Sequence, residues 1–452
     1  MTLLPKIHRK SPRMNNRSRT RFAFPLLLLI AVLVIVGCTP VPSGGDNIRT
    51  QPPFTPIPGA TTLIPTNAPP TATPRPPTLT NTPRPPTVTN TRAPDSATPT
   101  RPPAVQITAT TTTGVTTFGL RRAVGAQRGF WQVYFTAPDG SRDASTYFGG
   151  VDEMFAASIA AARSTIDLAG YEFNLPTVTR AVLDAHTRGV RVRIVTDDED
   201  GLEDDNTTLG QLVNAGIPVV VDGRSALMHN KFTIIDSTLV WTGSWNYTVN
   251  DTYRNNNNAL VLRSRSAVNV YQAEFDEMFV GGQFGPRSPV GTGNVFNQDG
   301  IPIEIYFAPE GEVVEAIIRE INGARQSIRF MAFSYTVDDM ANAMINRASA
   351  GVNLRGIFER VGSETQYAEL TPMFCAGLQV RQDGNTFILH HKVIVIDRTT
   401  VLTGSFNFSA NAIDSNDENL VIIRDPDLAA QYLAEFDRRW SEAITPTGLT
   451  CS

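Results

Sequence analysis

The stretch that decides the fold is HNKFTIIDSTLVWTGSWN at residues 229–246, which recurs as HHKVIVIDRTTVLTGSFN at residues 390–407. Each copy opens on a histidine, followed by a lysine, an aspartate and a Gly-Ser-x-Asn turn, all at the same spacing. Each of these six positions matches by chance about one time in twenty, so two copies in register are not a coincidence. The chain carries a duplicated motif.

The duplication extends well beyond the motif. Three further segments recur at an offset of 161 or 162 residues: 162–166 as 324–328, 189–193 as 351–355, and 274–276 as 435–437. A nearly constant offset over more than a hundred residues predicts two homologous domains. We place them at residues 118–285 and 286–447.

Within each half, predicted strands alternate with predicted helices. In the first half an amphipathic helix around residues 154–162 precedes a strand at 165–169. Pro176 can begin the next helix and Gly189 can end it, before a further strand at 190–196. The pattern predicts an α/β fold of two α/β/α sandwich halves related by a pseudo-twofold axis, each with a mixed, largely parallel sheet.

The spacing inside the motif suits phosphate chemistry. His229 and Lys231 lie two residues apart on a predicted strand, so both side chains leave the same face. The turn after the next strand can bring Ser244 and Asn246 to the same end. Two such halves would bring two histidines, two lysines and two asparagines together. The lysines and amides form a phosphate cradle without a metal ion, and the imidazoles provide a nucleophile and a general acid.

On these motifs the sequence resembles the phospholipase D superfamily, over roughly residues 125–445. The resemblance implies a metal-independent phosphodiesterase that needs no cofactor. In that family one motif histidine attacks phosphorus to form a phosphohistidine, while the other protonates the leaving alcohol. Water or another alcohol then releases the phosphate product.

The resemblance also assigns roles to the motif residues. The catalytic set that it implies is His229, Lys231, Asp236, His390, Lys392, Asp397 and Glu418. The phosphate-binding set is Ser244, Asn246, Ser405 and Asn407, and neither set includes a metal ligand. Within the catalytic set, we expect the two aspartates to act as scaffold that holds the strand and turn.

One position departs from the family pattern. The family places an acidic residue 28 positions after each motif histidine, where it bonds the imidazole of the other motif. Glu418 occupies that place in the second half, but Asn257 occupies it in the first. An amide oxygen can fix a tautomer but brings no charge. We expect Glu418 to orient His229 as the nucleophile and Asn257 to orient His390 as the acid.

The N-terminal segment has the pattern of an export signal. Residues 1–37 hold seven Lys/Arg and no acidic residue, and they end in an apolar run, Phe22–Gly37, followed by Cys38. This pattern predicts a lipoprotein-type signal peptide with lipidation at Cys38; the alternative is an uncleaved anchor helix. Residues 38–117 are rich in Pro and Thr and predict a disordered stalk. We therefore expect an extracytoplasmic protein that is anchored to the cell membrane as a lipoprotein.

The charge of the body bears on the substrate. Residues 118–452 hold 27 basic and 41 acidic residues, a net charge of −14, which repels a polyanion. Together with the anchor, this favours a phospholipid, with phosphatidylcholine cleaved to phosphatidate and choline. An extracellular endonuclease that binds nucleic acid is the second choice, and an inactive phosphate-binding surface protein is the third. The motif does not distinguish headgroups, or water from an alcohol as acceptor. We expect a monomer.

Two further features have alternative interpretations. Cys375 and Cys451 can form a disulfide that holds the C-terminal tail, or they can remain thiols. The acidic run Asp197–Asp205 suggests calcium, but its spacing does not match a twelve-residue calcium loop. We expect a solvated loop there.

Overall fold

The computed structural model describes residues 108–451, apart from residues 113, 292 and 293. The predicted signal segment, Cys38 and the stalk as far as residue 107 lie outside this part. No helix within it combines the length and the apolar character needed to cross a bilayer.

The first half is built on one ten-stranded sheet. Its order is β1-β2-β3-β4-β10-β9-β8-β5-β6-β7. The strands are β1 (Thr108–Thr112), β2 (Val115–Gly119), β3 (Ala123–Arg128), β4 (Trp131–Thr136), β5 (Thr165–Gly170), β6 (Arg191–Thr196), β7 (Val219–Val221), β8 (Lys231–Ile235), β9 (Leu239–Gly243) and β10 (Asn258–Leu262). The helices are α1 (Val151–Ala161), α2 (Pro176–Thr187), α3 (Leu209–Asn214), α4 (Val249–Tyr253) and α5 (Arg265–Phe279).

The second half repeats this plan on an eight-stranded sheet. Its order is β11-β12-β18-β17-β16-β13-β14-β15. The strands are β11 (Val295–Gln298), β12 (Ile301–Ala308), β13 (Ser327–Ala332), β14 (Asn353–Phe358), β15 (Gln379–Gln382), β16 (Lys392–Ile396), β17 (Thr400–Gly404) and β18 (Glu418–Ile423). The helices are α6 (Val313–Gly323), α7 (Asp338–Ser349), α8 (Leu370–Cys375), α9 (Ala410–Asp414) and α10 (Pro426–Glu442).

The strand directions correct one detail of the predicted fold. Each sheet is mixed, but among the described strands only the β5-β6-β7 and β13-β14-β15 neighbours pair in parallel. The motif strands β8 and β16 run antiparallel to both of their neighbours. The prediction of largely parallel sheets is therefore wrong. A tight turn joins β8 to β9 in the first half and β16 to β17 in the second, and each forms a hairpin, which imposes antiparallel pairing.

The folded body also begins earlier than predicted. Residues 108–117, assigned from the sequence to the stalk, include β1 and the start of β2, and these two strands pair with each other. Strand β2 in turn pairs with β3. Threonine is a good strand former, and Gly114 takes a positive φ of 81° in the connecting turn. A run of threonines is therefore ambiguous between stalk and strand.

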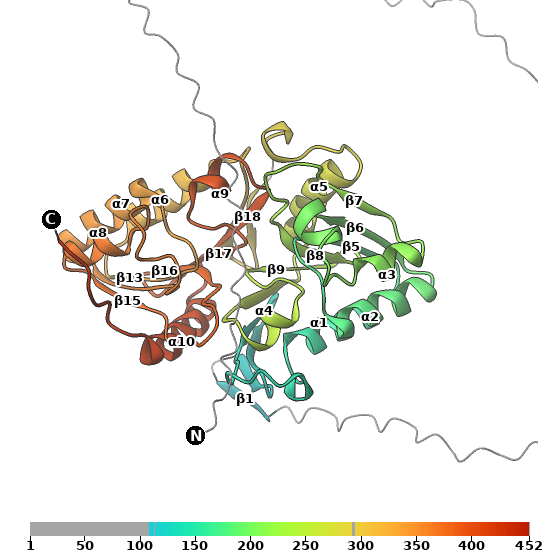
Figure 1. Ribbon diagram of the computed structural model, residues 1–452, viewed down its shortest axis with the longest axis horizontal. Helices are drawn as coiled ribbons and strands as arrows, with labels where there is room; N and C mark the ends of the chain where they lie inside the picture. The colour runs from blue at the N-terminus through green and yellow to red at the C-terminus, as the bar shows by residue number, and fades with distance from the viewer. Residues whose placement is uncertain (1–107, 113, 292–293, 452) are drawn as a thin grey trace, which may run out of the picture. The chain divides into compact units, whose positions relative to one another are not determined.

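Buried apolar side chains form three cores. One lies between α1–α3 and the first sheet, and another lies between α6–α9 and the second sheet. The third is central and takes its residues from α5, α10 and both sheets. Figure 1 shows β17 beside β9, where the halves meet. The central core therefore joins the two halves, and it does so around the motif strands.

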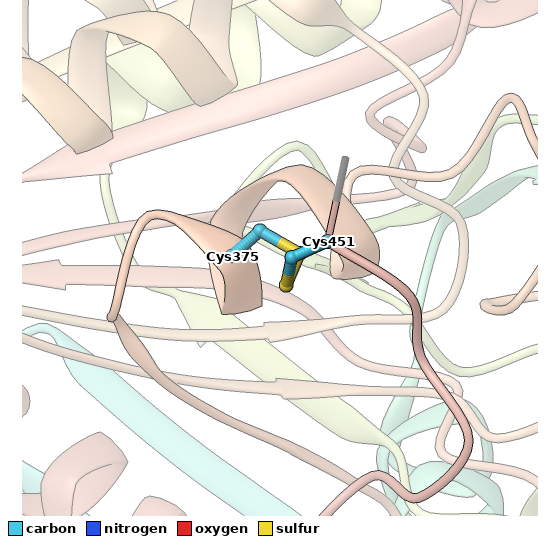
Figure 2. The surroundings of a disulfide bond; sticks show 2 residues. All are labelled: Cys375 and Cys451. Atoms are coloured by element: carbon cyan, nitrogen blue, oxygen red, sulfur yellow. A yellow bond between two sulfur atoms is a disulfide. The ribbon is translucent and has the colours of Figure 1, made fainter.

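The C-terminal tail is covalently attached to the second half. Cys375, the last residue of α8, is disulfide-bonded to Cys451 (Figure 2). The bond spans 76 positions of sequence, and Leu449 in the same tail packs against the core of the second half. The disulfide alternative is therefore the one found in the structure.

Candidate active site

The two motif strands bring their lysines into equivalent positions. Lys231 is the first residue of β8 and Lys392 is the first residue of β16, and each is 1% exposed. Each amino group donates to the backbone carbonyl of its own motif histidine, at 2.7 Å for His229 and 3.0 Å for His390. Both halves therefore hold a buried lysine amino group against the backbone of their motif histidine.

Backbone hydrogen bonds between the halves hold the motif histidines in place. The N–H of His390 donates to the carbonyl of Asn256 at 2.9 Å, and the N–H of Asn256 donates to Ile388 at 2.8 Å. On the other side, the N–H of Asp417 donates to the carbonyl of Leu227 at 2.9 Å. Each half thus places the turn before its last strand against the histidine segment of the other half.

This packing pairs His229 with Glu418. The Nδ1 atom of His229 lies 2.8 Å from both carboxylate oxygens of Glu418, and the glutamate is fully buried. With Nδ1 bonded to the carboxylate, the Nε2 atom of His229 is the nitrogen left for chemistry.

His390 has a different partner. Its Nδ1 atom lies 2.9 Å from Oδ1 of Asn257, which is an uncharged acceptor. The structure therefore confirms the contacts across the two halves that were predicted from the sequence: Glu418 contacts His229, and Asn257 contacts His390.

The motif serines bind the orienting residues, which corrects their predicted role in phosphate binding. Ser244 Oγ donates to Asn257 Oδ1 at 2.8 Å, and Ser405 Oγ donates to Glu418 Oε2 at 2.6 Å. Both serines are 0% exposed, and each hydroxyl also accepts a backbone N–H from the residue that follows its partner. With its donor and acceptor capacity already used, each hydroxyl cannot also bind a phosphate.

The motif aspartates lie outside the site, which corrects their place in the predicted catalytic set. Asp236 follows β8 and accepts the backbone N–H groups of Arg163, Ser164 and Thr165 at 2.7–3.1 Å. Asp397 accepts three N–H groups at the equivalent place in the second half. The lysines stand at the opposite ends of these strands, about 16 Å away at ~3.3 Å per residue. Both aspartates therefore serve as scaffold, which agrees with the expectation that they hold the strand and turn in place.

The motif asparagines have binding capacity to spare. The Oδ1 atoms of Asn246 and Asn407 are buried and have no hydrogen-bond partner among the described residues. A phosphodiester oxygen only accepts hydrogen bonds, so these oxygens cannot themselves bind it. The Nδ2 amide groups of the same two side chains can donate, and they remain the candidates for phosphate contact.

Electrostatics make the site a receptor for an anion. Burial lowers the pKa of Lys231 to about 8, although Glu418 and Glu172 favour the charged amine. Burial and the charge of Lys231 together hold the pKa of Lys392 well below its usual range. The two lysines therefore repel each other across one buried site, and a bound anion would relieve that repulsion.

The histidines are kept neutral by the same environment. Burial, followed by the charges of Lys231 and Lys392, lowers the pKa of both His229 and His390 well below the usual range. Burial raises the pKa of Glu418 to about 8, with Lys231 opposing the shift. A neutral imidazole has a free electron pair on Nε2, as a nucleophile needs.

Sequence reasoning missed two aromatic residues in the site. The ring of Tyr171 lies edge-on to His229 at 4.8 Å between centroids, and Phe333 meets His390 in the same way at 4.8 Å. Lys231 and Lys392 lie over these same two rings at 5.0 and 4.8 Å. Both aromatics end the strand next to the motif strand and stand 162 positions apart, so the repeat offset could have identified them.

The acidic run is partly buried, which corrects its prediction as a solvated loop. Asp197 is 1% exposed, and its carboxylate accepts the N–H of Met228, the residue before His229. Glu359 accepts the N–H of Leu389 at the same place in the second half. Asp197, Asp198 and Asp222 bring carboxylate oxygens within 4.8 Å of one another. Because both halves use an acidic residue in this way, the role of Asp197 is to hold the motif strand.

The scaffold role of Asp236 predicts a loss of stability without a loss of anion binding. Replacing Asp236 by Ala removes the charge-assisted bonds from three backbone N–H groups and from the Ser164 hydroxyl, and it leaves alanine at a φ of 51°. We expect the free energy of unfolding to fall by about 1–3 kcal/mol in urea denaturation. Titration with dimethyl phosphate should give an unchanged affinity. A weakened affinity in a variant of unchanged stability would place Asp236 in the site instead.

The pKa of Lys231 predicts how anion binding depends on pH. The lowered pKa means that the amine is charged below about pH 8 and neutral above it. The affinity for dimethyl phosphate, whose own charge does not titrate in this range, should therefore fall as pH rises through about 8. Calorimetry from about pH 6 to about pH 10 measures this. An affinity that stays constant up to the ordinary pKa of lysine would contradict the prediction.

Comparison with known proteins agrees with this geometry. The family model described as "Cardiolipin synthase, PLD-like domain" matches residues 155–279 and 317–440, which together make up more than half of the chain. The mitochondrial cardiolipin hydrolase of Xenopus tropicalis is 41% identical over 118 residues, 26% of this chain and 56% of that protein. A phospholipase D of Rickettsia felis is 35% identical over 137 residues, 30% of this chain and 68% of that protein.

The chain spans little more than half the length of the cardiolipin hydrolases that it matches. Among solved structures, phosphatidylserine synthase from Haemophilus influenzae covers 67% of this chain, which in turn covers 88% of that protein. The TM-score is 0.51 at 13% identity, a likeness of fold. With two matched domains and this fold, the chain belongs to the phospholipase D superfamily.

Proposed function

We propose that the chain is a metal-independent phosphodiesterase that works through a phosphohistidine and cleaves the headgroup bond of a phospholipid. One observation carries the proposal. Each motif histidine is bonded at Nδ1 by a residue of the opposite half, beside a buried lysine. Both Nε2 atoms are therefore available to one phosphorus.

In the first step, the Nε2 electron pair of His229 attacks phosphorus. A P–N bond forms, the P–O bond to the headgroup alcohol breaks, and His390 transfers a proton from Nε2 to the departing oxygen. Lys231 and Lys392 neutralise the charge on the non-bridging oxygens. The negative charge of the bound diester also favours the protonated form of His390, which the lysines alone disfavour.

In the second step, His390 acts as a base. Its neutral Nε2 takes a proton from water, the water oxygen bonds to phosphorus, and the P–N electron pair returns to His229. The products are a phosphate monoester and a free enzyme with His390 protonated again. With phosphatidylcholine as substrate they are phosphatidate and choline.

The choice of His229 as nucleophile follows from its partner. Phosphorylation at Nε2 places a positive charge on the imidazole, and this charge favours the ionised form of Glu418, whose carboxyl group lies 2.8 Å from Nδ1 and whose pKa burial raises to about 8. A carboxylate stabilises that charge, whereas the amide of Asn257 behind His390 supplies only a dipole.

Several features support a lipid substrate. Two relatives are named for lipid hydrolysis, as a cardiolipin hydrolase and as a phospholipase D. The body carries a net charge of −14 over residues 118–452, which disfavours a polyanionic strand. The signal-like segment of residues 1–37, followed by Cys38, leads us to propose a protein outside the cytoplasm, held at the membrane by a lipidated cysteine. We also propose that it is a monomer.

The two histidines should behave differently in a trapping experiment. With radiolabelled bis(p-nitrophenyl) phosphate, whose leaving group needs no acid, a His390→Asn variant should release about one nitrophenolate per chain and keep the label. Without its base, that variant cannot complete the second step. A His229→Asn variant should keep no label. Label retained by the His229 variant and not by the His390 variant would reverse the assignment.

A parallel assay tests the substrate class. Phosphatidylcholine vesicles and plasmid DNA are incubated with the full chain, each with EDTA, beside a chain in which both histidines are replaced. We expect the wild type to release choline and the chain without the two histidines to release none. DNA cleavage without choline release would favour the nuclease, and no reaction on either substrate or on the nitrophenyl ester would indicate an inactive binding protein.

A further inference from the structure

The two orienting residues leave an imbalance of charge. Glu418 gives His229 both a hydrogen-bond acceptor and a negative charge, whereas Asn257 gives His390 an acceptor alone. His390 is nevertheless surrounded by cations. Burial and the charges of Lys392 and Lys231 disfavour its protonated form, and His229 and His391 act in the same direction. A general acid in this position needs a negative charge from another source.

The structure contains a carboxylate beside His390. Asp251 Oδ2 lies 3.6 Å from the Nδ1 atom of His390, and Asp251 is 3% exposed. The residue lies in α4, directly after the Gly-Ser-x-Asn turn of the first half. Its oxygens accept the backbone N–H of Asn246 at 3.1 Å and the amide of Asn255 at 2.6 Å. These bonds hold the carboxylate in place beside the imidazole.

The direct ion pair of Asp251 is with a histidine. Among the described residues, it forms an ion pair with His390 and with no lysine or arginine. Other buried acids contact a guanidinium, as Asp417 does with Arg224 and Glu435 does with Arg439. The charge of Asp251 also favours the charged forms of Lys231 and Lys392, and at 3.6 Å from the imidazole it favours a proton on His390.

The two halves of the repeat differ at the position of this carboxylate. The position equivalent to Asp251 in the second half, 161 residues later, is Ala412 in α9, and it is fully buried. The first half therefore has Asp251 with Asn257, and the second half has Ala412 with Glu418. Each half supplies one carboxylate to the histidine of the site, from two different elements.

We propose that Asp251 and Asn257 divide between them the task that Glu418 performs alone. Asn257 fixes the tautomer of His390 through the hydrogen bond, and Asp251 supplies the charge that stabilises the protonated acid. Asp251 is a positioning residue, because it acts on the substrate only through His390. This inference rests on the proposed function, in which His390 protonates the leaving group.

The kinetic test compares leaving groups on one lipid scaffold. In Asp251→Asn, one amide oxygen still accepts the Asn246 N–H, and Asn255 can turn its own amide to match the new one. First-turnover release of choline from phosphatidylcholine should fall by about tenfold to a hundredfold. Release of nitrophenolate from phosphatidyl-p-nitrophenol, which needs no acid, should change less than about threefold.

Two further variants complete the design. A D251N/N257E double variant places a glutamate where Glu418 stands in the other half, and it should recover at least part of the lost choline release. Asp414→Asn removes an exposed charge from α9 and should leave both rates unchanged. Equal losses for the two leaving groups, or no recovery in a double variant with the wild-type melting temperature, would overturn the proposal.

A measurement without turnover separates this inference from the proposed function. In the complex with dimethyl phosphate, ¹⁵N-histidine spectra report the protonation of His390, identified by the signal lost in His390→Gln. The pKa of His390 should be lower in Asp251→Asn by about one unit, with a smaller change at His229. If the wild type cleaves no phosphodiester, the proposed function fails, yet this shift still tests Asp251. If the pKa of His390 is unchanged in Asp251→Asn, the proposed role of Asp251 is wrong.

Discussion

The site depends on the hydrogen bonds that each half makes to the histidine of the other. His229 is oriented by Glu418 and His390 by Asn257, and neither half contains a complete site of its own. These bonds form only when the turn before the last strand of each half lies against the opposite motif segment. The central core around α5 and α10 fixes that relation, because its residues come from both sheets. The orientation of both histidines, and with it the chemistry of the site, therefore depends on how the two halves pack.

Burial gives the site both its reactivity and its electrostatic cost. Two lysines and two histidines are removed from water together, which lowers the pKa of all four groups. Carboxylates from both halves offset part of this cost, with Glu418 behind one imidazole and Asp251 beside the other. The part of this cost that the carboxylates do not offset favours the binding of an anionic ligand. Burial and the charges of the lysines keep the imidazoles neutral before substrate binds. The negative charge of the bound substrate then allows one of them to gain a proton.

Much of this arrangement could be predicted from the sequence. Strand alternation places His229 and Lys231 on one face, and the resemblance to the phospholipase D superfamily, which places an orienting residue 28 positions after each histidine, identifies Glu418 and Asn257. Other features depend on three-dimensional neighbours. The serines look like phosphate ligands until their hydroxyls are seen bonded to Asn257 and Glu418. Asp251 lies outside the motif spacing, and only its contact with His390 reveals it.

The central claim is that one anion is shared by the two halves, and a crystal structure of the full chain with vanadate tests it most directly. We expect one vanadate per chain, between the Nε2 atoms of His229 and His390, with both lysines in contact. Two vanadates bound in separate places, one by each motif, would contradict it.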